Sequence, residues 1–426
     1  MSKFQLILLI IFGVFIVVAV ILFSMFRGGG VAIPNVVIWG DIPASDFNNL
    51  LDTSGLRNSP AATIQYVEKS NTTFGADFTE ALALGAGPDL VILSQENLWK
   101  ERNKLLLIPS SSISQKDFTS TFIEEGELFY GAGGVYALPL IVDPLVLYWN
   151  RDLFSKASLA LPPKFWDEIY DYAQKLTEKD NAGNIVKSAI ALGEAKNIPN
   201  TKDILSLLML QAGTPVTSLI NGSLRVEFNN NFGLPINPAQ AALDFYTQFS
   251  NPAKPFYTWN RSLKSAGTAF TSGDSAMYIG YASELKNLLA RNPTLNLGIT
   301  LVPQSRVSNK AITFSRISAV SVVKNSRNSS AALSVALSLV SKDVMTNLSK
   351  VLSLPPTRRD LLSIKQTDLA KSVFYEAAIQ SKGWLDPDDL RTTQIFNDMI
   401  DSVTSGRART SEALNTAGDQ INALIK

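Results

Sequence analysis

Hydrophobic positions along the chain follow two patterns, and their alternation predicts an α/β protein. Apolar residues recur at helical spacing in several segments, for example at Trp166, Ile169, Ala173 and Leu176. Short runs of apolar, β-branched and aromatic residues lie between such segments and predict buried strands. These runs lie at 35–41, 89–93, 105–109, 136–142, 145–149, 190–193, 275–281, 297–302 and 312–323. Strands that alternate with helices are typical of open α/β sheets.

The stretch 136–149 contains two of these runs, with Asp143 and Pro144 between them. Pro144 cannot donate to a β-ladder, and it favours an extended backbone at Asp143. The pattern therefore predicts a strand that leaves one sheet and enters another, which is the first hinge of a two-lobed protein. The alternative is a hairpin loop with an exposed Asp143.

Two further segments predict additional crossings between the lobes. The β-rich stretch 312–323 has a polar break at Ser315 and Arg316, like the break at Asp143. The proline-rich segment 354–358 predicts a rigid third connection. The predicted first lobe then contains residues 33–142 and 318–354, and the second contains residues 143–317 and 355–426.

Residues 4–26 carry no charge and predict a transmembrane helix. At about 1.5 Å per residue, they would span a hydrocarbon core of ~30 Å. A cleavable signal peptide has a shorter apolar region followed by small residues, so we expect an uncleaved anchor. Residues 28–30 are all glycine, so residues 1–30 are predicted to be an anchor and a flexible linker.

Composition excludes several classes of function. Lys and Arg together number 38 and Asp and Glu 37, so the net charge of +1 offers no basic surface for nucleic acid. The chain has no Cys and no His. This excludes disulfides, thiolate and imidazole metal sites, Cys nucleophiles and every triad with a His base. Carboxylate pairs, Ser-Lys chemistry or a Tyr side chain remain open to an enzyme, and no metal and no cofactor are predicted.

Polar side chains follow several of the predicted strands, where ligands bind in open α/β sheets. Trp39 and Asp41 end the first strand, although an ordinary strand-to-helix turn explains them equally well. The next strand is followed by Gln95, Glu96 and Asn97. Hydrogen-bonding groups at two strand ends predict a polar ligand.

A later strand end and three aromatic segments add candidates for the same site. Asn197 lies beyond the strand at 190–193. Trp259 lies in a segment that suits either a loop packed on the core or a stacking platform. Tyr281 ends a strand, and Trp384 precedes the carboxylates at 386, 388 and 389 in a loop. A capping loop at the surface is the alternative for this last segment.

Six segments, in this order, are similar to the maltose-binding-protein-like extracellular solute-binding proteins. The similarity runs from about residue 35 to the end of the chain. The segments are VVIWGD at 36–41, AGPDLVIL at 86–93, YALPLIVDPLVLYWNRDLF at 136–154, PPKFWDE at 162–168, FTSGDSAMYIG at 270–280 and SGRARTSEAL at 405–414.

The resemblance implies a two-lobed periplasmic-binding-protein fold of type II, with three crossings between the lobes. It also implies a sugar-like ligand that is bound in the cleft by hinge closure and delivered to an ABC permease. Asp143 matches the crossing acid that hydrogen-bonds a sugar in this family. Asp41 and Gln95 to Asn97 match the first and second strand-end sites. Tyr281 lies near the stacking aromatic of the family, and Trp384 lies near an aromatic of the second lobe.

The sequence departs from the family pattern at three points. Phe165 replaces the usual Ser or Thr helix cap, and Tyr281 stands where Trp is common. The absence of Cys excludes a lipoprotein anchor, so residues 4–26 would replace it. The family topology places the soluble domain outside the cell membrane.

These observations lead to one main hypothesis and two alternatives. The main hypothesis is a monomeric, membrane-anchored solute-binding subunit without enzymatic activity, whose partners are a small-molecule ligand, most simply a sugar, and the permease. The ligand contacts are Trp39, Asp41, Gln95, Glu96, Asn97, Asp143, Asn197, Trp259, Tyr281, Arg316 and Trp384. One alternative is an anchored glycan hydrolase that uses Asp143 with Glu96 or Glu194. The other is a receptor that signals to a sensor partner.

Overall fold

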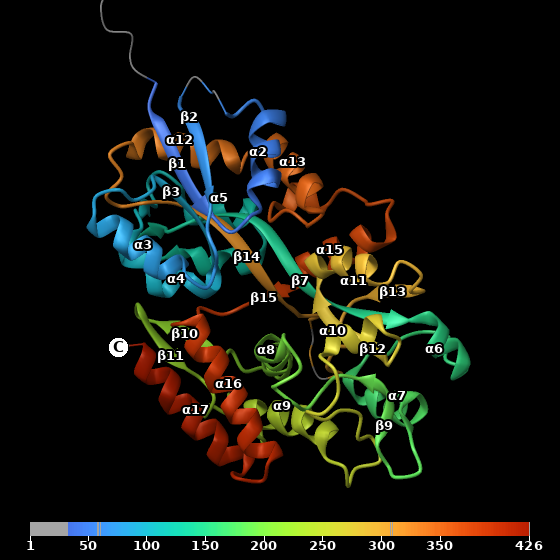
Figure 1. Cartoon of the computed structure of the whole chain (residues 1–426). Helices are drawn as coiled ribbons and strands as arrows, with labels where there is room; N and C mark the ends of the chain where they lie inside the picture. Colours follow the sequence, from blue (N-terminus) through green and yellow to red (C-terminus); the bar gives the residue numbers. More distant parts are fainter. Residues whose placement is uncertain (1–32, 58, 60, 307, 309, 426) are drawn as a thin grey trace, which may run out of the picture.

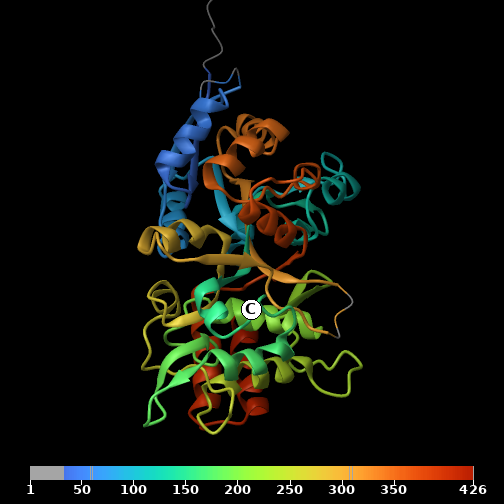
Figure 2. The same cartoon turned by 90° about the vertical axis from the view of Figure 1, so that its right-hand side faces the viewer.

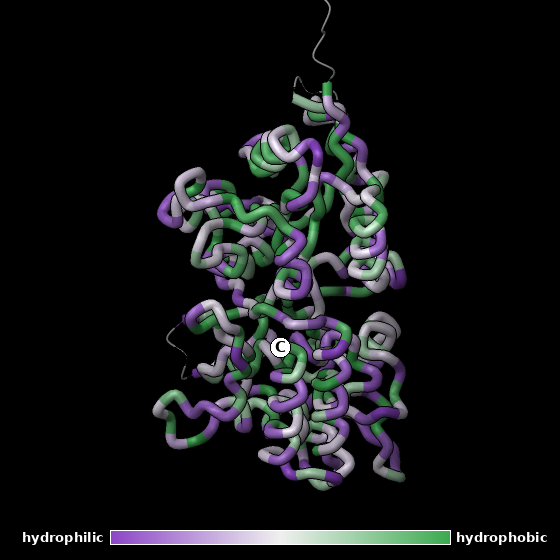
Figure 3. Tube along the Cα trace, turned by 90° about the vertical axis from the view of Figure 1, so that its left-hand side faces the viewer, coloured by the Kyte–Doolittle hydropathy of each residue, from purple (hydrophilic) through white to green (hydrophobic). Residues whose placement is uncertain are grey.

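The computed structural model describes residues 33–425, except 58, 60, 307 and 309. This part of the chain forms two lobes, one above the other (Figures 1 and 2). Each lobe has its own cluster of buried apolar side chains, and the lobe that contains Val36 is called the first lobe. Polar and apolar positions alternate along many of the helices, as expected for segments with one packed face (Figure 3).

One ten-stranded sheet runs through both lobes, in the order β2-β1-β3-β14-β7-β12-β9-β8. In addition, β13 pairs with β7 and β15 pairs with β14. The strands are β1 (Asn35–Gly40), β2 (Thr63–Glu68), β3 (Leu90–Ser94), β7 (Leu138–Asn150), β8 (Glu178–Lys179), β9 (Ile185–Ile190), β12 (Ser275–Tyr281), β13 (Leu297–Thr300), β14 (Thr313–Val322) and β15 (Ser381–Lys382).

The first lobe has parallel strands β1, β2 and β3, which β14 joins in the antiparallel sense. The sequence pattern missed β2, because this strand lies at the edge of the sheet and only Ile64 and Tyr66 are buried. The helices and short strands of this lobe are α2 (Ala44–Thr53), α3 (Phe74–Ala83), α4 (Gln95–Glu101), η1 (Arg102–Lys104), β4 (Ile108–Pro109), α5 (Gln115–Thr121), η2 (Glu124–Phe129), β5 (Tyr130–Gly131), β6 (Gly134–Val135), α12 (Ser329–Leu339), α13 (Lys342–Leu352) and α14 (Arg359–Leu362).

The second lobe packs helices against β12, β9 and the second half of β7. Its helices and hairpin are α6 (Arg151–Lys156), η3 (Trp166–Glu168), α7 (Ile169–Leu176), α8 (Thr201–Ala212), β10 (Thr217–Ile220), β11 (Ser223–Val226), α9 (Pro238–Thr247), η4 (Gln248–Ser250), α10 (Ala266–Thr271), η5 (Ala282–Glu284), α11 (Leu285–Arg291), α16 (Asp389–Thr404) and α17 (Thr410–Leu424). A turn at 180–184 joins β8 to β9.

Strands β7 and β14 pass side by side from one lobe to the other (Figure 1). Along β7, Val142 belongs to the first core and Leu145 to the second. Asp143 therefore lies within a continuous strand, and the alternative of a hairpin loop at this position is wrong. Asp143 pairs with Arg316 of β14, and the ladder has a β-bulge between Ser318 and Ala319.

The structure departs from the predicted boundary at residue 355. Residues 355–362 stay with the first lobe, because Leu361 and Leu362 pack in its core. The Thr357 N–H donates to the Leu140 carbonyl at 3.1 Å, and this bond fastens the segment to β7. Helix α15 (Leu369–Ile379) lies at the junction and packs against β7, and β15 follows it. From α15 to α16 the chain contacts both cores, since Phe374 and Trp384 pack in the second core and Leu385 packs in the first, so the third crossing lies later than the prolines suggested.

No helix in the described part of the chain is long and apolar enough to cross a bilayer. The predicted anchor at 4–26 and its glycine linker lie outside the described residues.

Candidate functional site

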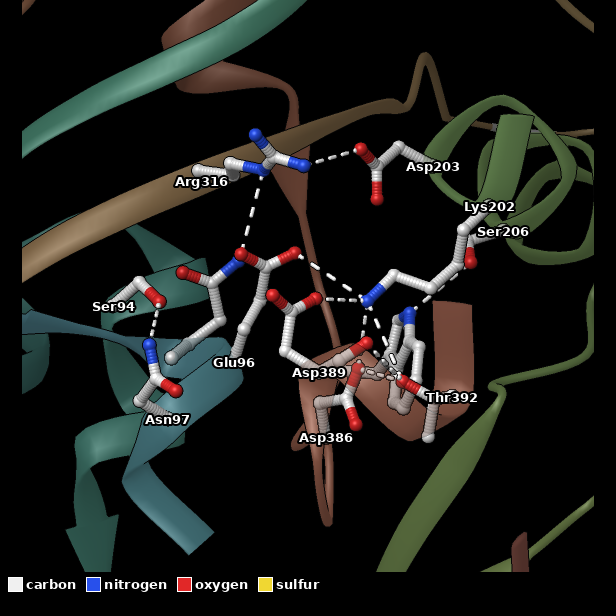
Figure 4. Close-up of polar contacts among 12 residues, drawn as sticks. Ser94, Glu96, Asn97, Lys202, Asp203, Ser206, Arg316, Asp386, Asp389 and Thr392 are labelled. Atoms are coloured by element: carbon white, nitrogen blue, oxygen red, sulfur yellow. Dashed lines mark hydrogen bonds and ion pairs between the residues drawn. The ribbon is translucent and has the colours of Figure 1, made fainter. Parts of the chain in front are cut away.

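Three of the predicted site residues meet where the two lobes face each other. Glu96 comes from the first turn of α4 in the first lobe, Tyr281 from the end of β12 in the second lobe, and Arg316 from the crossing strand β14. Arg316 Nε lies 3.4 Å from Glu96 Oε2, and its guanidinium lies 4.4 Å from the centre of the Tyr281 ring. Glu96 lies between Arg316 and Lys202 (Figure 4).

Gln95 fixes the position of Glu96. The Gln95 side chain donates to the Ser315 carbonyl at 2.9 Å and accepts from the Ile317 N–H at 2.7 Å. Both bonds go to the backbone of β14, so the start of α4 is attached to the crossing strand. Gln95 is fully buried and therefore positions its neighbour, and Asn97 donates to Ser94 Oγ at 3.3 Å.

Asp203 is the second carboxylate that holds Arg316. It lies in the first turn of α8 and is buried. Asp203 Oδ2 accepts from Arg316 Nη2 at 2.7 Å and from the Tyr281 hydroxyl at 2.8 Å. The other oxygen, Oδ1, has no hydrogen-bond donor among the described residues. Burial and the adjacent Asp203 together raise the pKa of the Tyr281 hydroxyl well above its usual range.

Lys202 is the centre of a second group of charges within the second lobe. Its ammonium contacts Asp386 Oδ2 at 2.9 Å, the Asp389 carboxylate and Thr392 Oγ1 at 3.5 Å. Burial lowers the pKa of Lys202, but Asp386 and Glu96 outweigh it, so the net shift is upward. Thr392 donates to Asp386 Oδ2 at 2.7 Å, and the Asp388 N–H donates to Asp386 Oδ1 at 3.0 Å. Asp386 is thus fully hydrogen-bonded.

Glu96 differs from these neighbours, because no hydrogen bond to its carboxylate is found among the described residues. Its Oε1 lies 3.9 Å from Lys202 Nζ, and Oε1 has no donor. The side chain is nevertheless buried. Burial raises the pKa of Glu96 to about 7, although Arg316 and Lys202 attract the charged form.

Asp143 lies on the same side of the junction as Arg316, its partner in the ladder, and is half-buried. Its Oδ1 accepts from the Ser283 N–H at 3.0 Å. Burial raises the pKa of Asp143 to about 6, against the opposing effects of the Ser283 bond and of Arg316. The Arg316 side chain keeps 42% of its surface exposed, so the junction is open to solvent beside this pair.

Glu125 is a further buried carboxyl that the sequence pattern did not indicate. It lies in η2, and the Ser315 hydroxyl donates to it. Burial raises its pKa to about 8. A Cβ added at Gly383, in the segment that enters the second lobe, would lie 2.3 Å from Glu125 Oε1. Glycine at this position therefore lets the segment pass directly over the carboxyl.

Trp39 and Asp41 lie at a neighbouring strand end. Asp41 is exposed and accepts from Asn71 at 2.8 Å, and Lys69 lies 4.1 Å from the centre of the half-buried Trp39 ring. Within the described residues, no hydrogen bond or ion pair joins Trp39 or Asp41 to Glu96.

Three predicted contacts have structural roles inside the second lobe. Trp259 is completely buried and donates to Asn197 Oδ1 at 2.9 Å, while Asn197 donates to the Asn260 and Leu263 carbonyls. Trp384 is 3% exposed and donates to Ser206 Oγ at 3.1 Å. These indoles pack the core, and the face of Tyr281 is covered by Arg316. None of these three aromatic side chains presents a free face for stacking.

A separate cavity of about 610 Å³ opens on the second lobe, and none of the predicted site residues lines it. Its walls are mainly apolar and include Trp166, Tyr170, Leu208 and Phe245.

One known protein family matches most of the chain. The family described as bacterial extracellular solute-binding protein matches residues 57–372, about three quarters of the 426 residues. The chain belongs to this family. Its members bind a solute, and the predicted absence of enzymatic activity agrees with this membership.

Known structures share the fold of this solute-binding protein. A cyclic α-maltosyl-1,6-maltose binding protein from Arthrobacter globiformis superposes with a TM-score of 0.76 at 18% identity and covers 93% of this chain and 100% of its own. A cyclo/maltodextrin-binding protein complexed with maltotetraose gives a TM-score of 0.75 at 19% identity and covers 93% and 99%. At these identities the likeness establishes the mixed α/β periplasmic-binding-protein fold and nothing finer.

Sequence relatives of the solute-binding protein match only a short part of the chain. Two proteins described as binding proteins, from Brucella abortus and Brucella suis, are each 29% identical over 102 residues. The match spans 23% of this chain and about a quarter of the length of these relatives, 24%.

The hydrolase alternative needs two free carboxylates on opposite sides of a substrate. Glu194, one of its candidates, is buried in the second lobe and pairs with Arg261 at 3.2 Å. Glu96, the other, is flanked by Lys202 and Arg316. Both carboxylates are therefore engaged by cations, and no observation in the solute-binding protein favours hydrolysis.

Sequence reasoning missed several members of the site. Lys202 and Asp203 stand at the start of an otherwise hydrophobic helix, and this charged pair was the available signal. The carboxylates at 386 and 389 were noted beside Trp384, but their partner Lys202 lies far away in the sequence.

Proposed function

We propose that this protein is the membrane-anchored, extracytoplasmic solute-binding subunit of an ABC importer, and that its ligand is a carbohydrate bound between the lobes. The family membership supports the general role. The neighbours of the same fold include proteins named for maltodextrins, which supports the ligand class. Residues 4–26 would hold the monomer at the membrane beside its permease.

The observation that carries the proposal is the position of Asp143 and Arg316. They face each other on the two strands that join the lobes, at a half-buried point. A ligand that touches both would contact the pivot itself, so its binding would favour one angle between the lobes. Glu96 reaches this point from the first lobe and Tyr281 from the second.

Of the predicted contacts, the proposal keeps those with polar atoms at or near the junction. These are Asp41, Glu96, Asn97, Asp143 and Arg316, with Trp39 as the half-buried aromatic. Carboxylates accept from sugar hydroxyls, and amides and guanidinium groups donate to them. Gln95 positions α4, and Asn197, Trp259 and Trp384 support the second lobe.

Calorimetry against a panel of oligosaccharides tests the proposal. We expect at least one sugar to bind, and we expect Asp143→Asn to weaken that binding by about tenfold or more, because a charged acceptor is lost. Asp152→Asn, at an exposed position beyond the same strand, is the matched control. If no sugar binds or stabilises the protein, the carbohydrate part of the proposal is wrong.

A further inference from the structure

The charges at the lobe junction do not balance. Four carboxylates, those of Glu96, Asp203, Asp386 and Asp389, meet two cations, Lys202 and Arg316, in one connected group (Figure 4). Within this group the carboxylates exceed the cations by two.

Both cations are already engaged by carboxylates on the second-lobe side. The ammonium of Lys202 contacts Asp386, Asp389 and Thr392, all from one loop and helix start. The Arg316 guanidinium donates to Asp203 through Nη2, while its Nε has no acceptor among the described residues. Glu96 receives only ion-pair contacts at 3.9 Å from Lys202 and 3.4 Å from Arg316, and neither is a hydrogen bond.

Two carboxylate oxygens are left without a donor. Glu96 Oε1 and Asp203 Oδ1 make no hydrogen bond among the described residues, although Glu96 is 6% and Asp203 2% exposed. Buried carboxylates normally accept several hydrogen bonds, because ionised oxygen loses its water on burial. These oxygens come from opposite lobes, so a group bound between the lobes could serve both.

We propose that the solute bound at this junction carries a protonated amine, which donates to Glu96 and Asp203 and offsets the excess of carboxylates. An anionic solute would add to that excess. A neutral hydroxyl would supply a donor but no charge. This inference rests on the proposed function, because it uses the same interlobe site. An amino sugar and a linear polyamine share the required chemistry.

A trisaccharide series on one scaffold distinguishes these cases. We would compare maltotriose with derivatives that carry an amine or a carboxylate at every C6 position, and we would add spermidine as an amine without sugar rings. Calorimetry at pH 8 keeps alkylamines protonated. We expect the amine derivative to bind at least tenfold more tightly than maltotriose, since hydrogen bonds to charged groups are the stronger ones.

Glu96→Gln removes the charge and keeps an acceptor oxygen, so the amine derivative and maltotriose should then bind with affinities within about threefold of each other. Asp171→Asn changes the charge equally at an exposed position of α7 and should leave the preference unchanged. A preference that survives in Glu96→Gln, or a carboxylate derivative that binds most tightly, would overturn the inference.

The outcomes also separate this inference from the proposed function. If maltotriose binds as well as its amine derivative, the amine inference is wrong and the carbohydrate proposal stands. If only spermidine binds, the amine inference holds and the carbohydrate proposal is wrong. If none of the four probes binds, the carbohydrate proposal and the amine inference are both wrong for ligands of these classes.

Discussion

The two lobes contribute to their junction in different ways. The second lobe brings Lys202, whose ammonium is held by Asp386, Asp389 and Thr392 of the same lobe. The first lobe brings Glu96, whose carboxylate has cations nearby but no hydrogen bond among the described residues. The contacts of Lys202 within the second lobe therefore do not depend on the angle between the lobes, although Asp203 Oδ1 of that lobe has no donor among the described residues. Glu96 is compensated only when the lobes approach or when a ligand binds.

The largest expected effect tests whether the second-lobe network depends on its cation. Lys202→Met would leave Asp386, which is completely buried, without its counterion. We expect a loss of about 3–5 kcal/mol in the free energy of unfolding, because the variant retains an uncompensated buried charge. Urea denaturation measures it. Lys175→Met, which removes an exposed pair with Asp171, is the control and should cost under about 1 kcal/mol.

A Lys202→Met variant as stable as the control would show that Asp386 is neutral or solvated, and the contrast between the lobes would then be lost.

The next effect concerns the first lobe and depends on pH. The pKa of Glu96 is raised from 4.5 to about 7, so the folded state favours the protonated carboxyl. The resulting stabilisation is complete below about pH 4.5 and is lost as pH rises through about 7. Glu96→Gln cannot ionise, so above pH 7 it should be more stable than the wild type by up to roughly 3 kcal/mol.

Urea denaturation of both proteins between pH 4.5 and 8.5 measures this difference, with Glu178→Gln at an exposed strand as the control. If Glu96→Gln is the less stable protein at pH 8, the attraction of Lys202 and Arg316 for the Glu96 carboxylate exceeds the free-energy cost of burying it. The charge of Glu96 is then compensated within the protein, and the contrast between the lobes is wrong.

A smaller effect tests how closely the lobes approach. Gly383→Ala would place a Cβ 2.3 Å from Glu125 Oε1. We expect a loss of about 1–3 kcal/mol, because the buried carboxyl must move. Gly267→Ala in α10 is the matched control, since its Cβ would lie 3.7 Å from the nearest atom. Thermal denaturation compares them, and equal melting temperatures would show that Glu125 moves freely.

The smallest expected effect comes from an ion pair at the edge of the junction. Lys100 of α4 contacts Asp388, which caps α16, at 2.9 Å. A double-mutant cycle with Lys100→Met and Asp388→Asn should give a coupling of about 0.2–1 kcal/mol that falls with added salt, since Asn retains the cap. A coupling energy that does not change with salt would contradict this, because it would mean that solvent ions do not screen the Lys100–Asp388 pair.

The sequence predicted those parts of the structure that depend on local patterns. The apolar runs around Asp143 predicted the crossing strand, because a strand buried along its length needs such runs whatever its partners are. The edge strand β2 was missed, since a strand with a solvated face carries half as many apolar positions. The third crossing was placed too early, because prolines mark a rigid segment but do not say which core lies beside it.

The sequence predicted only those site residues that local patterns mark. Glu96 and Arg316 could be proposed from strand ends and a polar break, which are local signals. The partnership of Lys202 with Asp386 spans 184 residues, and no local pattern reports it. Trp259 and Trp384 were proposed as contacts because exposed and buried indoles look alike in a sequence, yet both pack the second lobe. Residue type alone therefore does not distinguish a ligand contact from a core residue.

The β-bulge between Ser318 and Ala319 has a mechanical consequence. The ladder keeps its register at Ser315, Arg316 and Ile317, and the irregularity lies on the first-lobe side of these pairs. A bulge interrupts pairing and permits bending, so we expect the two crossing strands to flex there. Asp143, Arg316 and the start of α4, which Gln95 bonds to the backbone at Ser315 and Ile317, would then keep their mutual positions while the two strands bend beyond Ser318. Amide exchange faster at Ala319 than at Ile317 is the expected signature of that bending.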